Sequence, residues 1–254
     1  DVVINCAAHV GSVHYGMEHE ADLVYDNMMI FLNLYEGLKA LNKKVKVINP
    51  VSNCSYPSSA DIQSEEGWWD GMPHSSALTY ASVKRMNYVV SRSYYLQHGI
   101  ETKNFILPGI YGPNNHTDID RVHALDGMIL RMINSYNNND KEFTIWGTGS
   151  PIREWCFIDD LVNLIVKITK SNKDMLYPVN IAQKKGFSIK EIAIIIKDKV
   201  GFKGELVFDT SYEDGAPVKI LDNKNFIKVF PNFNFTTIES GIQSSVEYYN
   251  KIIK

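Results

Sequence analysis

The sequence has few cysteines, little net charge and no long apolar run, and each shortage excludes a class of protein. Its 254 residues include 3 cysteines, whose spacing is typical of neither a zinc site nor a disulfide framework. Such usage fits a reducing compartment, so we expect a cytoplasmic protein without a metal site. A formal net charge of −3 gives no electrostatic reason to expect nucleic acid or an anionic membrane as a partner. No apolar run reaches the roughly 18 residues of a membrane span.

A glycine-rich phosphate loop is missing as well. Neither Gly-x-x-Gly-x-x-Gly nor Gly-x-Gly-x-x-Gly follows an early strand. A dinucleotide site needs such glycines because the backbone must approach the pyrophosphate closely at a helix N-terminus. Gly147 and Gly149 belong to a motif in the second half of the chain and cannot replace this loop. The sequence therefore holds at most part of a dinucleotide site.

Strands and helices alternate over residues 1–107. The expected elements are strands at 2–8, 44–49 and 102–107 and helices at 21–41 and 77–98. Gly99 follows the second helix at a position suited to a left-handed residue after a helix end. This alternation implies parallel strands joined by helical crossovers. We predict an α/β protein with a Rossmann-type, doubly wound parallel sheet.

The pattern loosens after residue 107. Helices are expected at 123–135, 159–171, 188–200 and 236–254, and strands at 142–146 and 206–208. Ser188 and Glu191 form a capping box at the start of one of these helices. Mixed short elements are typical of a small lobe beside a sheet. We predict a smaller α/β lobe over residues 108–254, with some segments returning to the first domain.

Tyr80 and Lys84 carry the chemistry that the sequence indicates most clearly. They stand one helical turn apart, so their side chains share a helix face, and the lysine cation is expected to lower the tyrosine pKa. With the hydroxyl of Ser52 at a strand end, they could pass a proton to a carbonyl oxygen while hydride arrives at its carbon. Tyr35 and Lys39 have the same spacing, but no serine precedes them at a strand end.

Four further motifs stand in order along the chain. They are Asn5-Cys-Ala-Ala8, Tyr111-Gly-Pro113, Trp146-Gly-Thr-Gly-Ser-Pro-Ile-Arg153-Glu154 and Phe157-Ile-Asp-Asp160. Together with Tyr80 and Lys84 they resemble the extended short-chain dehydrogenases/reductases that act on nucleotide sugars. The resemblance covers nearly the whole chain and is far more specific than the tyrosine and lysine alone.

Within that family the sequence is most similar to the GDP-L-fucose synthase type. The similarity lies in Ser52-x-Cys54-x-Tyr56-Pro57, in Glu213-Asp-Gly-Ala-Pro-Val-Lys219, and in a histidine eight residues before an arginine, His123 and Arg131. The resemblance implies 3,5-epimerisation and then 4-reduction of a GDP-4-keto-6-deoxyhexose. It implies NADP as cofactor, with NAD as the alternative, and a homodimer formed through the helices at 21–41 and 77–98.

The resemblance also implies roles for single residues. Ser52 and Tyr80 would hold the C4 carbonyl, with Tyr80 as proton donor, and Lys84 would bind the nicotinamide ribose. Cys54 and His123 would be the acid–base pair of epimerisation. The remaining expected contacts are Ala7 and Ala8 with the cofactor, and Arg131, Trp146, Arg153 and Lys219 with the nucleotide diphosphate and base.

The family pattern further implies a partial dinucleotide-binding domain at 1–107 and a mainly nucleotide-sugar-binding lobe at 108–254. The glycine-rich loop and the residue that separates NAD from NADP would then precede Asp1. We expect roughly 55–60 residues there, since one βαβ unit takes about 30.

Departures from the family pattern leave the sugar open. Val51 stands where the pattern has glycine, Asn53 replaces serine, and Gly109 stands where an asparagine contacts the sugar. The segment at 65–73 is closer to relatives known only as sugar epimerases. Three alternatives remain: a nucleotide-sugar 4-epimerase, a 4-keto-heptose reductase, and a non-catalytic protein that binds nucleotide sugars.

Each candidate also has a purely structural interpretation. Cys54 could be a plain buried cysteine, and His123 a solvated residue at a helix start. Arg153 could pair with Glu154 or Asp159 at the surface, and Lys219 could be a solvated loop lysine. Trp68 and Trp69 are expected to serve only for packing in their loop.

Overall fold

The computed structural model describes residues 1–11, 13–41, 43–118 and 121–253. A parallel sheet in the order β1-β2-β4-β9 forms its centre. The strands are β1 (Val2–Ile4), β2 (Lys46–Ser52), β4 (Glu101–Leu107) and β9 (Val179–Asn180). Register places Ile4 opposite Ile48, and Ser52 opposite Leu107. The carboxyl ends of these strands therefore lie along one edge.

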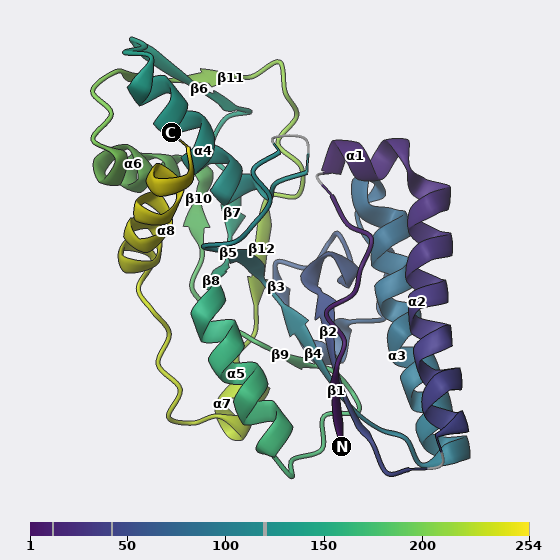
Figure 1. The fold of residues 1–254 in the computed structure, drawn as a ribbon. Helices are drawn as coiled ribbons and strands as arrows, with labels where there is room; N and C mark the ends of the chain where they lie inside the picture. Colours follow the sequence, from purple (N-terminus) through teal and green to yellow (C-terminus); the bar gives the residue numbers. More distant parts are fainter. Residues whose placement is uncertain (12, 42, 119–120, 254) are drawn as a thin grey trace.

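Helices cover both faces of this sheet. On one face α2 (Glu20–Ala40) and α3 (Leu78–His98) lie side by side, and on the other lie α5 (Ile158–Lys170) and α7 (Lys224–Val229) (Figure 1). Val47 packs into the core under α2 and α3, whereas its neighbour Ile48 packs into the core under α5 and α7. Successive strand residues point to opposite faces, so this pattern requires two helical layers. The predicted doubly wound α/β fold is confirmed.

A smaller group of elements packs around its own core. The helices α4 (Ala124–Asn137), α6 (Ile189–Val200) and α8 (Ile238–Ile252) surround the parallel pair β6 (Glu142–Trp146) and β11 (Glu205–Asp209) (Figure 1). Ile129, Phe143 and Ile196 are among the buried residues there. The expected helices and strands of this region are all present.

Short strands connect the two groups of elements. One mixed sheet has the order β10-β7-β12-β3, and β5 pairs with β8. The bounds are β3 (Ile62–Gln63), β5 (Gly109–Tyr111), β7 (Ile152–Arg153), β8 (Trp155–Phe157), β10 (Phe187–Ser188) and β12 (Val218–Leu221). None of these strands was predicted, because strands of two to four residues depend on distant partners rather than on a local pattern.

The first strand and its loop differ from the prediction. β1 ends at Ile4, and the chain then leaves the sheet and forms the short helix α1 (Val13–Glu18). β2 instead runs past its predicted end at Asn49 and includes Pro50. Proline is tolerated there because β1 has already ended opposite Ile48, so no strand on that side needs its N–H.

The expected helix ends are confirmed in detail. Gly99 adopts a left-handed conformation with φ of 68° after α3. The capping box joins Ser188 and Glu191 at the start of α6. The last helix ends at Ile252, and the predicted end at Lys254 lies outside the described residues. No helix in the described part of the chain has both the length and the apolar character needed to span a bilayer.

Candidate functional site

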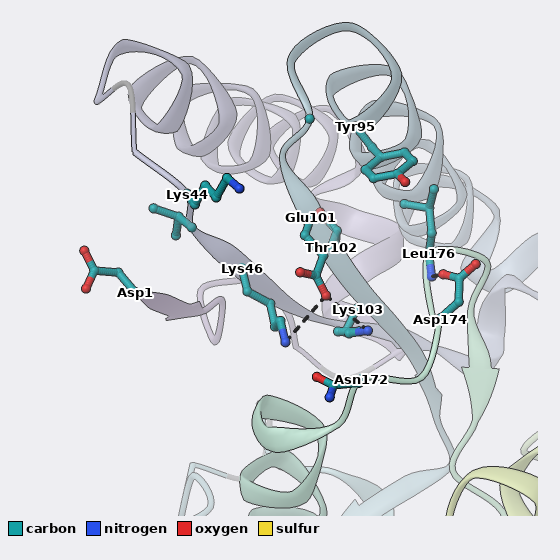
Figure 2. Close-up of a pocket in the computed structure, with 12 residues that line it drawn as sticks. Asp1, Lys44, Lys46, Tyr95, Glu101, Thr102, Lys103, Asn172, Asp174 and Leu176 are labelled. Atoms are coloured by element: carbon teal, nitrogen blue, oxygen red, sulfur yellow. Dashed lines mark hydrogen bonds and ion pairs between the residues drawn. The ribbon is translucent and has the colours of Figure 1, made fainter.

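One hollow in the described part of the molecule lies at the amino ends of the strands. It has a volume of about 680 Å³, and Figure 2 shows its charged lining, where Glu101 pairs with Lys46 and Lys103 at 3.5 and 3.1 Å. None of the predicted site residues is among its described lining. Ligands of parallel α/β sheets bind outside the carboxyl ends of the strands, so the candidate site is at the opposite edge.

The topology gathers predicted residues at that carboxyl edge. Ala7 and Ala8 follow β1 and are exposed, Ser52 ends β2, and Cys54 lies in the 3-10 turn η1 (Asn53–Ser55) directly after it. Ala7 donates its N–H to the side chain of Asn5 at 3.3 Å, which fixes the start of this loop.

Hydrogen bonds hold the loop that carries Ser52 and Cys54. Ser52 Oγ accepts from the Cys54 N–H at 3.4 Å, and Ser55 Oγ donates to the Ser52 carbonyl at 2.6 Å. Trp68 Nε1 donates to Ser55 Oγ at 2.8 Å, and Arg85 Nε donates to the Ser55 carbonyl at 2.7 Å. Ser52 and Cys54 therefore have a rigid backbone frame.

Trp68 has the packing role expected of it, since it is fully buried against Tyr88 and Tyr177. Arg85 was not predicted. Its place directly after Lys84 was the only sequence signal that could have indicated a role, since its burial is visible only in the fold.

Tyr80 and Lys84 lie together on α3. The Lys84 Nζ is 5.2 Å from the centroid of the Tyr80 ring, and Lys84 is only 7% exposed. The expectation that the lysine lowers the pKa of Tyr80 is wrong: burial raises that pKa, and the nearby Cys54 adds to the rise. Burial in turn lowers the pKa of Lys84 to about 8.

The second pair with the same spacing is structural. Tyr35 is fully buried, and its hydroxyl shares a hydrogen bond with Thr102 Oγ1 at 2.7 Å. Lys39 pairs with Glu36 at the surface at 3.0 Å. Tyr35 therefore belongs to the core, whereas the role of Tyr80 and Lys84 stays a prediction.

The surroundings of Cys54 have opposing effects on the pKa of its thiol. Burial raises the pKa of Cys54, while the Ser52 hydroxyl and the cations of Lys219 and Lys84 oppose that rise. Cys54 and Lys219 line the same small hollow, although they are far apart in the sequence. The fold thus places Lys219 in the same hollow as Cys54, a proximity that sequence reasoning did not foresee.

His123 stands on the other group of elements. It directly precedes α4 and makes no side-chain capping bond there. Desolvation around the imidazole lowers the pKa of His123, and the neighbouring His116 lowers it further. His123 does not line the hollow that holds Cys54.

Arg131 and Trp146 form a stack with a third residue. The guanidinium carbon of Arg131 is 4.3 Å from the Trp146 ring centroid, and Arg131 Nη1 donates to the Thr144 carbonyl at 3.1 Å. The ring of Tyr212 stacks on Trp146 at 5.3 Å and 20°. Trp146 remains 51% exposed. Tyr212 was missed because it stands one residue before the motif at 213–219, outside the residues that carry the resemblance.

Arg153 and Lys219 are neighbours across two strands. They are register partners in the parallel pair of β7 and β12. Desolvation lowers the pKa of both side chains, and the Arg153 charge also lowers that of Lys219. Two adjacent, poorly hydrated cations favour an anion such as a phosphate.

Packing explains the glycine at position 109. A Cβ there would lie 2.7 Å from Trp155 Cε3 and 3.3 Å from the Glu154 carbonyl. Trp155 therefore fills the space that the family's asparagine would need.

His9 lies in the loop after β1, and the sequence shows no metal-ligand spacing for it. Its Nδ1 lies 2.7 Å from the Asp26 carboxylate and its Nε2 lies 2.8 Å from the Tyr15 hydroxyl. This pair of contacts ties the loop to α1 and α2. The described residues contain no group of three or more His, Cys, Asp or Glu side chains placed to hold a metal ion.

Known proteins are similar to this chain in sequence and in fold over nearly its whole length. A GDP-L-fucose synthase of Dictyostelium discoideum is 30% identical over 250 residues, which are 97% of this chain and 77% of that protein. The crystal structure of a GDP-L-fucose synthetase from Naegleria fowleri bound to NADP has a TM-score of 0.88 and 26% identity, over 99% of this chain and 78% of that one. A GDP-6-OMe-4-keto-L-xylo-heptose reductase from C. jejuni shares the fold, with a TM-score of 0.88 and 23% identity over 99% of this chain and 82% of that one.

The family model described as NAD dependent epimerase/dehydratase matches residues 1–182. The predicted NAD(P)-dependent enzyme class is confirmed at this level. The family match, the sequence similarity and the shared fold show that the chain belongs to the NAD dependent epimerase/dehydratase family.

Proposed function

We propose that this protein is an NADP-dependent 3,5-epimerase and 4-reductase of a GDP-4-keto-6-deoxyhexose. The observation that carries the proposal is the position of Cys54 at the carboxyl end of β2, where Lys84 and Lys219 both act on its thiol and Tyr80 lies close enough to interact with it. A cysteine with a purely packing role needs no cations around it. A thiolate that removes a proton from carbon does.

Epimerisation requires two groups on opposite sides of the sugar. The C4 ketone makes the protons at C3 and C5 acidic, and the Cys54 thiolate removes one of them. The charge moves to the C4 oxygen, which accepts hydrogen bonds from Ser52 and Tyr80. Protonated His123 then returns a proton from the other face. Reduction follows when Tyr80 gives its proton to the same oxygen.

The residues present fit the nicotinamide end of a cofactor. Lys84 is buried and has no ion pair within the described residues, so its ammonium group is available for a ribose hydroxyl. Ala7 and Ala8 have small side chains, which leave room beside the carboxyl end of β1. The cofactor supplies hydride to C4 when it is bound. Burial raises the pKa of Tyr80 and so keeps it protonated as a donor, whereas Cys54 depends on the cations of Lys84 and Lys219 to form its thiolate.

The substrate assignment rests on charge and aromatic area. Arg153 and Lys219 would hold the diphosphate, while Arg131 and Trp146, with Tyr212 added, would hold the base. The GDP group is proposed because the relatives from Dictyostelium and Naegleria carry it in their names. The division into domains at 107/108, the homodimer and the cytoplasmic location likewise stay proposals.

The deciding experiment measures the incorporation of deuterium into the product sugar as well as the oxidation of NADPH. The protein is incubated with NADPH and GDP-4-keto-6-deoxymannose in D₂O, and the product sugar is analysed by NMR. We expect deuterium at C3 and C5 and a reduced C4. Cys54→Ser and His123→Gln should lose the deuterium, while Tyr80→Phe should lose the reduction. Reduction without deuterium in the unaltered protein would contradict epimerisation and favour a simple 4-reductase.

A further inference from the structure

A small hollow beside Cys54 is lined in part by Gln63 and His74, two polar residues that the proposed reaction does not use. Its lining includes Cys54 after β2, Gln63 in β3, His74 ahead of α3 and Lys219 in β12. Its volume of about 10 Å³ is near the smallest that holds one water-sized group. The hollow can therefore take a hydroxyl, but it is too small for a phosphate or a sugar ring.

Gln63 supplies a buried acceptor. The residue is only 3% exposed, and its backbone is fixed because its carbonyl accepts from Asn180 Nδ2 at 2.9 Å and from the Asp222 N–H at 3.0 Å. Its side-chain oxygen Oε1 is buried and has no hydrogen-bond partner within the described part of the chain. Buried acceptors are nearly always paired, so this oxygen needs a donor.

His74 supplies a donor whose position is fixed. It precedes the 3-10 turn η3 (Ser75–Ala77), and its Nδ1 accepts from the Ser76 N–H at 3.3 Å. A nitrogen that accepts carries no hydrogen, so the neutral imidazole of His74 has its N–H at Nε2. Lys219 adds ammonium donors to the same lining.

We propose that Gln63, His74 and Lys219 form a subsite for one hydroxyl group next to Cys54. A hydroxyl donates its hydrogen to Gln63 Oε1 and accepts from His74 Nε2–H or from Lys219. A methyl group makes neither bond, and an ionised carboxylate or phosphate has no hydrogen for Gln63. The occupant is either an ordered water or a hydroxyl of the sugar. The sugar hydroxyl rests on the proposed function, because that function places the sugar beside Cys54.

Crystal structures of the protein alone and with GDP-mannose distinguish these sources. The subsite predicts an oxygen within about 3.2 Å of Gln63 Oε1 in the protein alone. With GDP-mannose, a retained peak identifies a structural water, whereas replacement by a sugar oxygen identifies a substrate hydroxyl. If neither structure has an oxygen within that distance, the proposal is overturned.

Variants test the same subsite in solution. Gln63→Leu removes the acceptor at similar volume, and its control is Gln243→Leu on α8, where the amide donates only to Glu247 among its recorded partners. His74→Asn keeps a side-chain acceptor for the Ser76 N–H but removes the Nε2 donor. His74→Ala removes the acceptor and the donor together.

For a sugar hydroxyl we expect Gln63→Leu and His74→Asn to raise the Kd for GDP-mannose about tenfold, the loss of one hydrogen bond. For a water we expect an unchanged Kd but a lower urea midpoint for Gln63→Leu than for Gln243→Leu. A Gln63→Leu protein with an unchanged Kd and an equal or higher urea midpoint would overturn the subsite. None of these measurements needs turnover, so failure of the proposed reaction would be seen separately.

Discussion

Lys219 on β12 and Arg153 on β7 lie opposite each other in register, and Lys219 also reaches the hollow of Cys54. One lysine therefore connects the proposed diphosphate site with the proposed epimerisation site. Desolvation lowers the pKa of both cations, and an anion between them would relieve their mutual repulsion. Arg153 and Lys219 should thus differ in effect: loss of the arginine weakens binding, whereas loss of the lysine also changes the thiol.

The first prediction concerns Arg153 and the nucleotide. Arg153→Met should raise the Kd for GDP by about ten- to a hundredfold, because a hydrogen bond to a charged group contributes about 1.5–3 kcal/mol. Calorimetric titration with GDP measures this, and the difference should shrink at high salt. Lys224→Met is the control, since Lys224 is a surface residue that pairs with Asp222. Equal Kd values for Arg153→Met and the control would remove Arg153 from the site.

The second prediction concerns the reactivity of the Cys54 thiol. Lys219 and Lys84 both oppose the rise in the Cys54 pKa that burial causes. Lys219→Met should therefore raise this pKa further and slow the alkylation of Cys54 by iodoacetamide at pH 8, since only the thiolate reacts.

The alkylation assay uses a Cys6→Ser background, because Cys6 is exposed whereas Cys156 is fully buried. Mass spectrometry of the Cys54 peptide gives the rate. Arg153→Met in the same background is the matched control, since Arg153 lies beside Lys219 but has no recorded effect on the thiol. A rate that falls equally in both variants would indicate a general change of the loop rather than a lysine effect.

Local patterns predicted the long elements and their ends well. α3, for example, spans Leu78–His98 against an expected 77–98, because Gly99 marks its end. The same patterns could not give the side-chain network across the sheet. Asn5 Nδ2 lies 3.5 Å from Asn49 Oδ1, and Asn49 Nδ2 donates to Asn104 Oδ1 at 2.7 Å. Asn49 and Asn104 lie in β2 and β4 and Asn5 directly follows β1, so only the pairing of the strands brings these amides together.

The candidate site shows the same division. The motifs predicted Tyr80, Lys84 and Cys54, but the predicted direction of the Tyr80 pKa shift was wrong because spacing along a helix does not measure burial. The approach of Lys219 to Cys54 and the stacking of Tyr212 on Trp146 depend on loops from distant parts of the chain. Such contacts need the tertiary fold and have no local signal.

The third prediction tests why position 109 is glycine. Gly109→Ala places a Cβ 2.7 and 2.9 Å from Trp155 Cε3 and Cζ3, which should destabilise the fold by about 1–3 kcal/mol. A second change, Trp155→Phe, should recover part of this loss by making room. Urea unfolding measures both. The control is Gly37→Ala in α2, where nothing lies within 4 Å and alanine should stabilise the helix by up to about 1 kcal/mol. A neutral Gly109→Ala would mean that Trp155 moves freely.

The fourth prediction follows from the buried ammonium of Lys84. Its pKa is about 8 in the fold, below the value of 10.5 for a free lysine. Between these two pH values the Lys84 side chain binds more protons in the unfolded chain than in the folded protein. Lys84 therefore lowers the free energy of unfolding below pH 8. This loss of stability disappears as the pH rises toward 10.5. Lys84→Met should stabilise the protein at pH 7 by on the order of 2–3 kcal/mol, although it should abolish reduction.

Urea unfolding at pH 7 and pH 10 tests the sign of this effect. The advantage of Lys84→Met should be smaller at pH 10, while the surface variant Lys228→Met should show no difference from the unaltered protein at either pH. A destabilised Lys84→Met at pH 7 would show that the ammonium makes a favourable contact in the fold. The loss of activity with a gain in stability is the expected signature of a functional lysine held in an unfavourable environment.

The last prediction concerns the proposed homodimer. α2 and α3 bury one side of each helix against the sheet, yet Tyr25 and Met29 on α2 and Met86 and Val89 on α3 remain 65, 37, 42 and 37% exposed. Tyr25 and Met29 are one turn apart, as are Met86 and Val89, so each helix presents an apolar outer face. Two such helices facing their copies would make a four-helix bundle.

Met29→Glu with Met86→Glu should give a monomer in sedimentation at micromolar concentration, because each copy would then bury unpaired charges. Tyr136→Glu on α4, also at an exposed aromatic side chain, should leave the dimer intact. A monomeric unaltered protein would refute the dimer, whereas a dimer that persists in the double variant would place the interface elsewhere.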